Sequence, residues 1–173
     1  ENMNTQAVFS LFVRKLPATR NFILPCGLED ILRYLEGLKF TSEDINYLSS
    51  LGKFNENFLR WLQDFRFTGD VYALPEGTPV FANEPLLEII APVREAQLLE
   101  TYILNQIHFQ TLVATKAARV VSAARGIPVI DFGIRRMHGY DVGIKAPRAF
   151  YIAGVAATSN VLAGKIFNIP TAG

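Results

Sequence analysis

The sequence has few of the features that mark secreted or membrane proteins. Its single cysteine, Cys26, cannot form an internal disulfide, and no Asn-x-Ser/Thr glycosylation site occurs. The first residues, Glu-Asn-Met-Asn-Thr-Gln, lack both the basic start and the apolar run of a signal peptide. Nothing therefore points to an oxidising or secretory compartment, and we expect a cytoplasmic protein.

Neither sign of charge is in excess, and no hydrophobic run is long. The 17 Lys and Arg and 16 Asp and Glu leave a formal net charge of +1, which gives no whole-chain field for nucleic acid or an anionic membrane. The longest charge-free stretch, Ala149 to Gly164, contains several polar residues and is shorter than the roughly 20 apolar residues of a membrane-spanning helix. Any recognition of anions must therefore be local.

Hydrophobic residues make up 50% of the chain and aromatic residues 12%, a composition that excludes disorder and predicts a packed core. The 173 residues are too few for a complete α/β barrel, which needs about 250. Because the chain begins with Glu1 and ends at Gly173 without a polar tail, we expect it to be a segment of a longer protein.

The pattern of apolar residues predicts an α+β arrangement followed by one long helix. A helix over about 94–124 would be roughly 45 Å long, so we expect it to connect two domains, 1–125 and 126–173. The elements expected before it are strands at 7–13 and 22–24, helices at 28–38, from 41 and from 55, and an antiparallel meander between 65 and 92 with strands at 71–74, 79–81 and 86–90.

After the long helix the pattern predicts one unit of a parallel α/β architecture. A buried strand at 129–133 ends in Asp131, Phe132 and Gly133; a polar loop at 135–145 and a small-residue helix at about 147–165 follow. In such units ligands bind in the loop that follows the carboxyl end of the strand. The predicted fold class is therefore α/β: an α+β N-terminal domain and the first strand-helix unit of a barrel.

Two segments of this C-terminal part could carry chemistry. Residues 135–148 hold most of the local positive charge, which fits either an anion site or a solvated loop. Thr158, Ser159 and Asn160 interrupt an apolar helix, which fits a ligand site, a helix start, or hydroxyls bonded to the preceding turn. His108 and Cys26 are expected to be packed side chains, and no spacing of His, Cys or acids predicts a metal site.

Five motifs in order resemble the nicotinate phosphoribosyltransferases over nearly the whole chain. They are FTGDVYALPEGT at 67–78, EAQLLET at 95–101, ATKAAR at 114–119, DFGIRR at 131–136 and TSNVLAGK at 158–165. The resemblance implies an N-terminal α/β domain followed by an irregular α/β barrel. It also implies an enzyme that condenses nicotinic acid with phosphoribosyl pyrophosphate, giving nicotinate mononucleotide and pyrophosphate.

The resemblance further implies ATP as co-substrate, used through a phosphorylated histidine, and Mg²⁺ bound with the pyrophosphate group. The family works as a homodimer whose sites are completed by the neighbouring subunit's N-terminal segment. Neither nucleic acid nor a membrane is an expected partner.

Carried over residue by residue, the resemblance gives Phe132 the role of stacking on the pyridine ring and places Arg135 near the pyridine and pyrophosphate. Arg136 and Arg148 are expected phosphate contacts. Thr158, with Ser159 beside it, corresponds to the place where the similar nicotinamide enzyme carries an aspartate. A neutral hydroxyl can donate to a carboxylate that an aspartate would repel, so Thr158 favours the acid over the amide.

The sequence departs from the family where Val155-Ala156-Ala157 replaces a common Phe-Asp-Gly. The family's histidine corresponds to a position just after Gly173 and its stacking tyrosine to one before Glu1, so no catalytic residue is expected here and this chain alone should not turn over. Two alternatives stay open: a related phosphoribosyltransferase acting on nicotinamide or quinolinate, and a non-catalytic remnant or interaction module.

Overall fold

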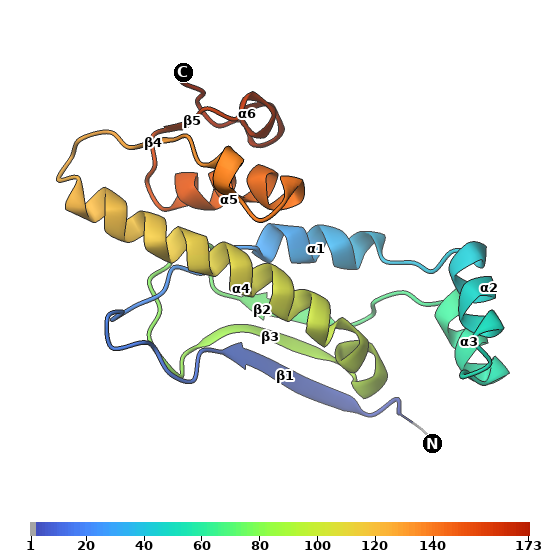
Figure 1. Ribbon diagram of the computed structural model, residues 1–173. Helices are drawn as coiled ribbons and strands as arrows, with labels where there is room; N and C mark the ends of the chain where they lie inside the picture. The colour runs from blue at the N-terminus through green and yellow to red at the C-terminus, as the bar shows by residue number, and fades with distance from the viewer. Residues whose placement is uncertain (1–2) are drawn as a thin grey trace.

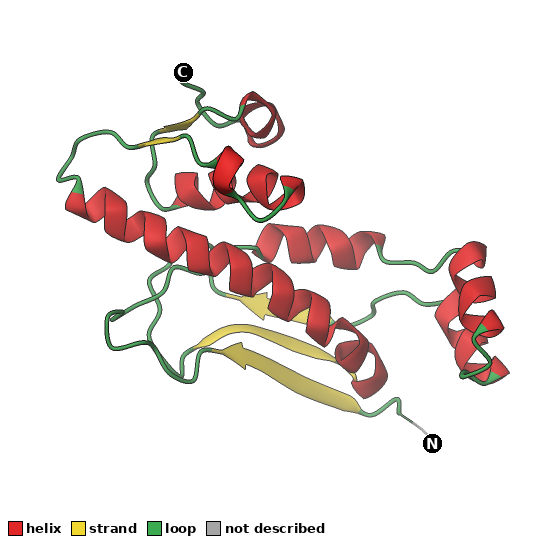
Figure 2. Cartoon of the chain, in the orientation of Figure 1, coloured by secondary structure: helices red, strands yellow, loops and turns green. Residues whose placement is uncertain are grey.

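The computed structural model describes residues 3–173, in which one long helix separates two small sheets (Figure 1). An antiparallel sheet lies on one side of this helix, and a short parallel sheet with its helices lies on the other (Figure 2). Helices and both kinds of pairing occur together, so the predicted α/β fold class is confirmed. No helix among residues 3–173 combines the length and apolar character needed to cross a bilayer.

The antiparallel sheet has the order β1-β3-β2, with β1 (Gln6–Phe12), β2 (Asp70–Ala73) and β3 (Pro85–Pro92). The central strand β3 is the most buried because it is paired on both edges, with Val8 and Asp70 both opposite Ile90. The expected strands at 22–24 and 79–81 are not formed. Ile23 and Val80 make only an isolated antiparallel bridge, because no neighbouring residues continue the ladder.

The helices expected before the meander are confirmed as α1 (Leu28–Gly37), α2 (Ser42–Ser50) and α3 (Glu56–Gln63). Thr41 and Asp44 form a reciprocal capping box at the start of α2, and the Asn55 side chain accepts from the backbone N–H of Phe58 at 2.9 Å. The α2–α3 pair projects from the body of the molecule (Figure 1), and α2 buries no residue.

The long helix α4 (Val93–Ala123) confirms the helix expected at 94–124 and contributes to two hydrophobic cores. Its first half buries Leu99, Ile103 and Ile107 against the antiparallel sheet and α1. Its second half presents the small residues Ala114 and Ala117 to the second core, which lets the next helix pack closely. The division into domains 1–125 and 126–173 stays a prediction.

The boundary between the two cores is polar and hydrogen-bonded. The hydroxyl oxygens of Thr111 and Thr115 on α4 accept from the backbone N–H groups of Cys26 and Leu24, at 3.2 and 2.9 Å. Gly27 follows with φ of 106°, and a Cβ there would come within 2.8 Å of the Gln106 carbonyl oxygen. Only glycine therefore lets this segment pass so close to α4.

The C-terminal part differs from the prediction in its boundaries. It contains β4 (Ile130–Asp131), the 3-10 turn η1 (Ile134–Arg136), α5 (Tyr140–Ile152), β5 (Ala157–Thr158) and α6 (Val161–Phe167). The expected strand at 129–133 is reduced to two residues. The expected loop at 135–145 is wrong because α5 starts inside it, and the expected helix at 147–165 is broken by β5.

Two local features explain why α5 and α6 are separate helices. Gly154, with φ of 98°, turns the chain after α5. Asn160 caps α6 by accepting from the N–H of Ala163 at 3.1 Å, while its amide donates to the carbonyl of Gly143 at 2.9 Å. Pro147 lacks the N–H that would bond this carbonyl within α5, so the Asn160 amide replaces the missing helical bond.

Strands β4 and β5 pair in parallel, and Thr171 forms a further parallel bridge to Thr158. The expectation of one strand-helix unit is therefore corrected: the segment holds two units, β4-α5 and β5-α6, followed by a third extended segment that joins the same sheet. Consecutive parallel strands linked by helices are the repeating pattern of an α/β barrel.

We expect Arg148→Met to destabilise the protein by roughly 2–3 kcal/mol, because it leaves the Glu76 carboxylate, only 14% exposed, without its cationic partner. The Arg148 guanidinium, only 18% exposed, donates to both carboxylate oxygens of Glu76 at 2.6 and 2.9 Å and to Glu29 at 2.6 Å. The measurement is urea unfolding. Arg33→Met is the matched control: its side chain, 65% exposed, also pairs with Glu29, and its loss should cost less than about 1 kcal/mol. Equal effects would contradict this ranking.

Burial raises the pKa of the Cys26 thiol from 9.0 to about 12, with the Glu76 carboxylate adding to the effect. We therefore expect native protein at pH 8 to resist alkylation by iodoacetamide and urea-unfolded protein to react. Because the native state holds this proton more tightly, the thiol's contribution to stability should be full below pH 9 and decline as the pH rises toward 12. Equal alkylation rates in native and unfolded protein would show that the thiol is accessible.

Candidate functional site

The candidate site lies where the parallel strands β4 and β5 end. Phe132 directly follows β4 and Ser159 directly follows β5, so parallel pairing brings both to the same edge. Gly173 joins them from the third segment: a Cβ there would lie 3.7 Å from Cε1 of Phe132 and 4.0 Å from Cβ of Ser159. Three stretches of chain thus meet at the carboxyl ends of the strands, where parallel α/β folds bind ligands.

A cavity of about 370 Å³ opens beside Phe132, between the second half of α4 and residues 129–138. Its walls are mainly apolar, and four charged or titratable side chains also line it: Lys116, Arg136, His138 and the acid Asp131. Phe132 itself is 55% exposed. A flat aromatic ring could lie against such a surface while nearby cations bind anionic groups.

A hydrogen bond between the buried Thr158 and the partly exposed Asp131 connects the strand ends. The Thr158 hydroxyl donates to Oδ2 of Asp131 at 2.9 Å, and the N–H of Gly133 donates to Oδ1 of the same carboxylate at 2.7 Å. The backbone carbonyl of Asp131 accepts from the N–H of Ser159 at 2.8 Å. Asp131 therefore ties the chain after β4 to the chain after β5.

The placement of Thr158 differs from the expectation that it contacts substrate. Its side chain is 1% exposed, and its one hydroxyl hydrogen is used by Asp131. The oxygen also accepts from the N–H of Asn160 at 3.1 Å. Ser159 is only partly buried and lies next to Phe132 and Gly173. Of the two neighbouring hydroxyls, Ser159 is the one that a ligand at the strand ends can reach.

The three arginines singled out from the sequence have different surroundings. Arg136 lines the cavity beside Phe132, and Arg135 is exposed in η1 on the same short turn. Arg148 does not fit a phosphate contact, because Glu76 and Glu29 occupy its guanidinium. The hydrogen bond to Glu76 is also the main reason why the pKa of Arg148 is raised. Its carboxylate partners lie 119 and 72 residues away in sequence, which local spacing could not reveal.

Sequence reasoning missed two residues at this site. Lys116 belongs to α4, far along the chain from the basic segment, and only the packing of α4 brings it to the cavity. Asp131 had a visible signal, since an acid at the end of a buried strand needs donors. Among residues 3–173 no group of three or more His, Cys, Asp or Glu side chains could hold a metal ion.

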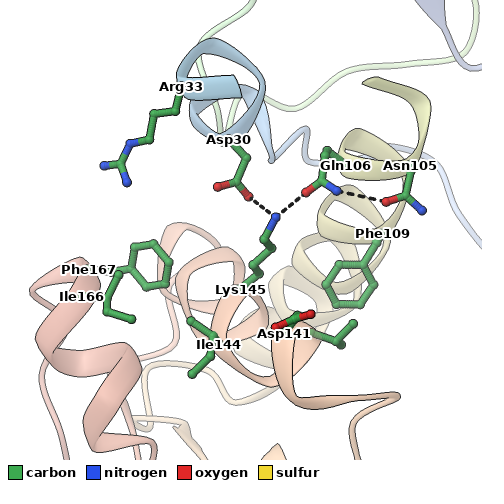
Figure 3. Close-up of a pocket in the computed structure, with 11 residues that line it drawn as sticks. Asp30, Arg33, Asn105, Gln106, Phe109, Asp141, Ile144, Lys145, Ile166 and Phe167 are labelled. Atoms are coloured by element: carbon green, nitrogen blue, oxygen red, sulfur yellow. Dashed lines mark hydrogen bonds and ion pairs between the residues drawn. The ribbon is translucent and has the colours of Figure 1, made fainter. Parts of the chain in front are cut away.

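A larger cavity of about 660 Å³ lies between α1, α4, α5 and α6 (Figure 3). Lys145 crosses it, with its ammonium 3.1 Å from Asp30 and 2.5 Å from the side-chain oxygen of Gln106. This cation is already paired, and the cavity is not lined by the residues that end the strands. We therefore place the candidate site at Phe132 rather than here.

Comparison with known proteins identifies the family. Residues 1–108 match the model of the nicotinate phosphoribosyltransferase N-terminal domain. A nicotinate phosphoribosyltransferase of Mycobacterium tuberculosis is 55% identical over all 173 residues, which are 37% of that protein. The crystal structure of human nicotinic acid phosphoribosyltransferase superposes with a TM-score of 0.88 at 36% identity, over 97% of this chain and 34% of that one.

A nicotinate-nucleotide pyrophosphorylase from Pyrococcus furiosus is similar in structure at 26% identity, with a TM-score of 0.76 over 97% of this chain and 36% of that one. The chain spans about a third of the length of the curated relatives it matches. The sequence match covers the whole chain and the structural match covers 97% of it. The chain belongs to the nicotinate phosphoribosyltransferase family.

Proposed function

We propose that the protein containing this chain joins nicotinic acid to phosphoribosyl pyrophosphate, producing nicotinate mononucleotide and pyrophosphate for NAD biosynthesis. The observation that carries this proposal is the cavity at the carboxyl end of β4, where an exposed phenylalanine lies beside cationic side chains. Membership of the family supplies the reaction, and this geometry supports the binding of an aromatic acid near phosphate.

In this reaction the pyridine nitrogen attacks the anomeric carbon as the bond to pyrophosphate breaks, and the leaving group keeps the electron pair. Both partners must be held close together and in line. The ring of Phe132 offers a face on which the pyridine can stack. Arg136 and Lys116 from the cavity wall, with Arg135 on the adjacent turn, are the cations that could hold phosphate oxygens.

Mg²⁺ would enter with the pyrophosphate group and neutralise its charge. The residues present fit this arrangement, because the cavity wall offers cations that could hold the phosphate oxygens the ion leaves free. We propose ATP as co-substrate. The residues that bind it, and the phosphorylated histidine, would belong to the two-thirds of the family's length that this chain does not span. By itself the chain would then be inactive.

The hydroxyl that favours the acid over the amide is Ser159 in this proposal. Thr158 is buried and donates to Asp131, whereas Ser159 lies beside Phe132 at the strand ends. A related phosphoribosyltransferase acting on another pyridine remains the second candidate, since the similar Pyrococcus structure bears the name of a nicotinate-nucleotide pyrophosphorylase. We also propose a homodimer and a cytoplasmic location, the latter because the one cysteine is a free thiol.

For the intact protein we expect pyrophosphate release that depends on nicotinate, phosphoribosyl pyrophosphate and ATP. Phe132→Leu should raise the KM for nicotinate about tenfold, because the stacking face is lost. The matched control is Phe81→Leu: Phe81 is equally exposed, at 55%, but does not line the cavity, so the KM should stay within about twofold. No release from the intact protein would favour a non-catalytic module.

Ser159→Asp should lower the ratio of kcat/KM for nicotinate to that for nicotinamide by more than about tenfold. The new carboxylate repels the acid and can accept a hydrogen bond from the amide. Ser159→Ala is the control, since it removes the hydroxyl without adding charge and should not improve use of the amide. An unchanged ratio in Ser159→Asp would show that this position does not face the pyridine substituent.

A further inference from the structure

The pair formed by Thr158 and Asp131 connects the two loops that carry the proposed pyridine contacts. Asp131 immediately precedes Phe132, and Thr158 immediately precedes Ser159. In the parallel register these two residues stand opposite each other, so their side chains share one face while the next residues project toward the other. The hydroxyl–carboxylate bond at 2.9 Å therefore lies behind Phe132 and Ser159.

The carboxylate of Asp131 also determines how the chain leaves β4. Its Oδ1 accepts from the N–H of Gly133, which closes a short turn around Phe132. A Cβ at position 133 would come within 2.9 Å of this oxygen, so a larger residue there would displace the carboxylate. The orientation of the aromatic ring thus follows from where the carboxylate is held.

Thr158 is in turn fixed to both neighbouring helices. Its oxygen accepts from the N–H of Asn160, which is itself 6% exposed. The Asn160 side chain caps α6 and donates to the carbonyl of Gly143 in α5. The hydroxyl consequently holds the Asp131 carboxylate against a part of the fold that cannot shift without breaking two further hydrogen bonds.

We propose that Thr158 is a positioning residue that acts through Asp131: it fixes the relative placement of Phe132 and Ser159, and it sets the affinity for the pyridine acid without touching it. This inference rests on the proposed function. It assigns the buried hydroxyl a role in substrate affinity that acts through Asp131 and Phe132.

The test uses the intact protein with nicotinate, phosphoribosyl pyrophosphate and ATP. Thr158→Val keeps the shape of the side chain but cannot donate to Asp131 or accept from Asn160. We expect the KM for nicotinate to rise about tenfold, while the KM for phosphoribosyl pyrophosphate stays within about twofold. Thr158→Ser restores the hydroxyl and should return the nicotinate KM to within about twofold of the wild type.

Thr115→Val is the matched control, because Thr115 is equally buried and its hydroxyl also bonds backbone groups, but it lies between the two cores. It should lower Tm without changing the nicotinate KM. Asp131→Asn gives a second measurement if Thr158→Val does not fold. Its amide oxygen can still accept from Thr158, but its NH₂ cannot accept from Gly133, so the nicotinate KM should again rise.

The outcomes separate this inference from the proposed function. Wild-type protein with no nicotinate-dependent pyrophosphate release contradicts the proposed function itself. Active wild type whose Thr158→Val variant keeps its nicotinate KM, or raises both KM values equally, overturns the positioning role. A Thr158→Ser variant whose nicotinate KM does not return toward the wild-type value also overturns it. Where Thr158→Val does not fold, an Asp131→Asn variant with an unchanged nicotinate KM overturns it.

Discussion

The placement of the candidate site depends on α4 packing into two cores at once. Larger aliphatic residues in its first half hold the antiparallel sheet, and small residues in its second half let α5 approach. Because a single continuous helix contributes to both contacts, the parallel strands are held in a defined position relative to the antiparallel sheet. The same helix supplies Lys116 and most of one wall of the cavity beside Phe132.

Between these cores, polar side chains bond parts of the fold to one another and are not free to bind a ligand. Arg148 joins α5 to α1 and to the turn at Glu76. The hydroxyl oxygens of Thr111 and Thr115 accept hydrogen bonds from backbone N–H groups of the segment before α1. Desolvating such groups is costly unless each one finds a partner, and here they do. A basic residue near a candidate site is therefore no guide to anion binding until its neighbours are known, as the contrast between Arg148 and Arg136 shows.

The site itself is built on strands of only two residues, so its geometry depends on side-chain bonds more than on a long ladder. Asp131, Thr158 and Asn160 provide these bonds, and Pro147 contributes by leaving a helical carbonyl free for Asn160. The role of Phe132 came from the resemblance of DFGIRR to the family motif, and the apolar run before it predicts a strand, although β4 is short and its Ile130 is exposed. The role of Thr158 could not be found from the sequence. Strand β5 has only two residues, both with small side chains, and they do not interrupt the apparent helical pattern at 147–165.

The sequence by itself determined α1 to α4, the central strand β3, the α/β class and, through its motifs, the family. These features depend on periodicity and on residues near one another in the chain, which are visible without coordinates. Only the tertiary structure decided that Arg148 is paired, that Thr158 faces inward while Ser159 faces the strand ends, and that Lys116 reaches the cavity. The reason is physical: each of these outcomes depends on which distant group meets a given donor or acceptor, and that is fixed by the packing of α4, α5 and the strands rather than by local spacing.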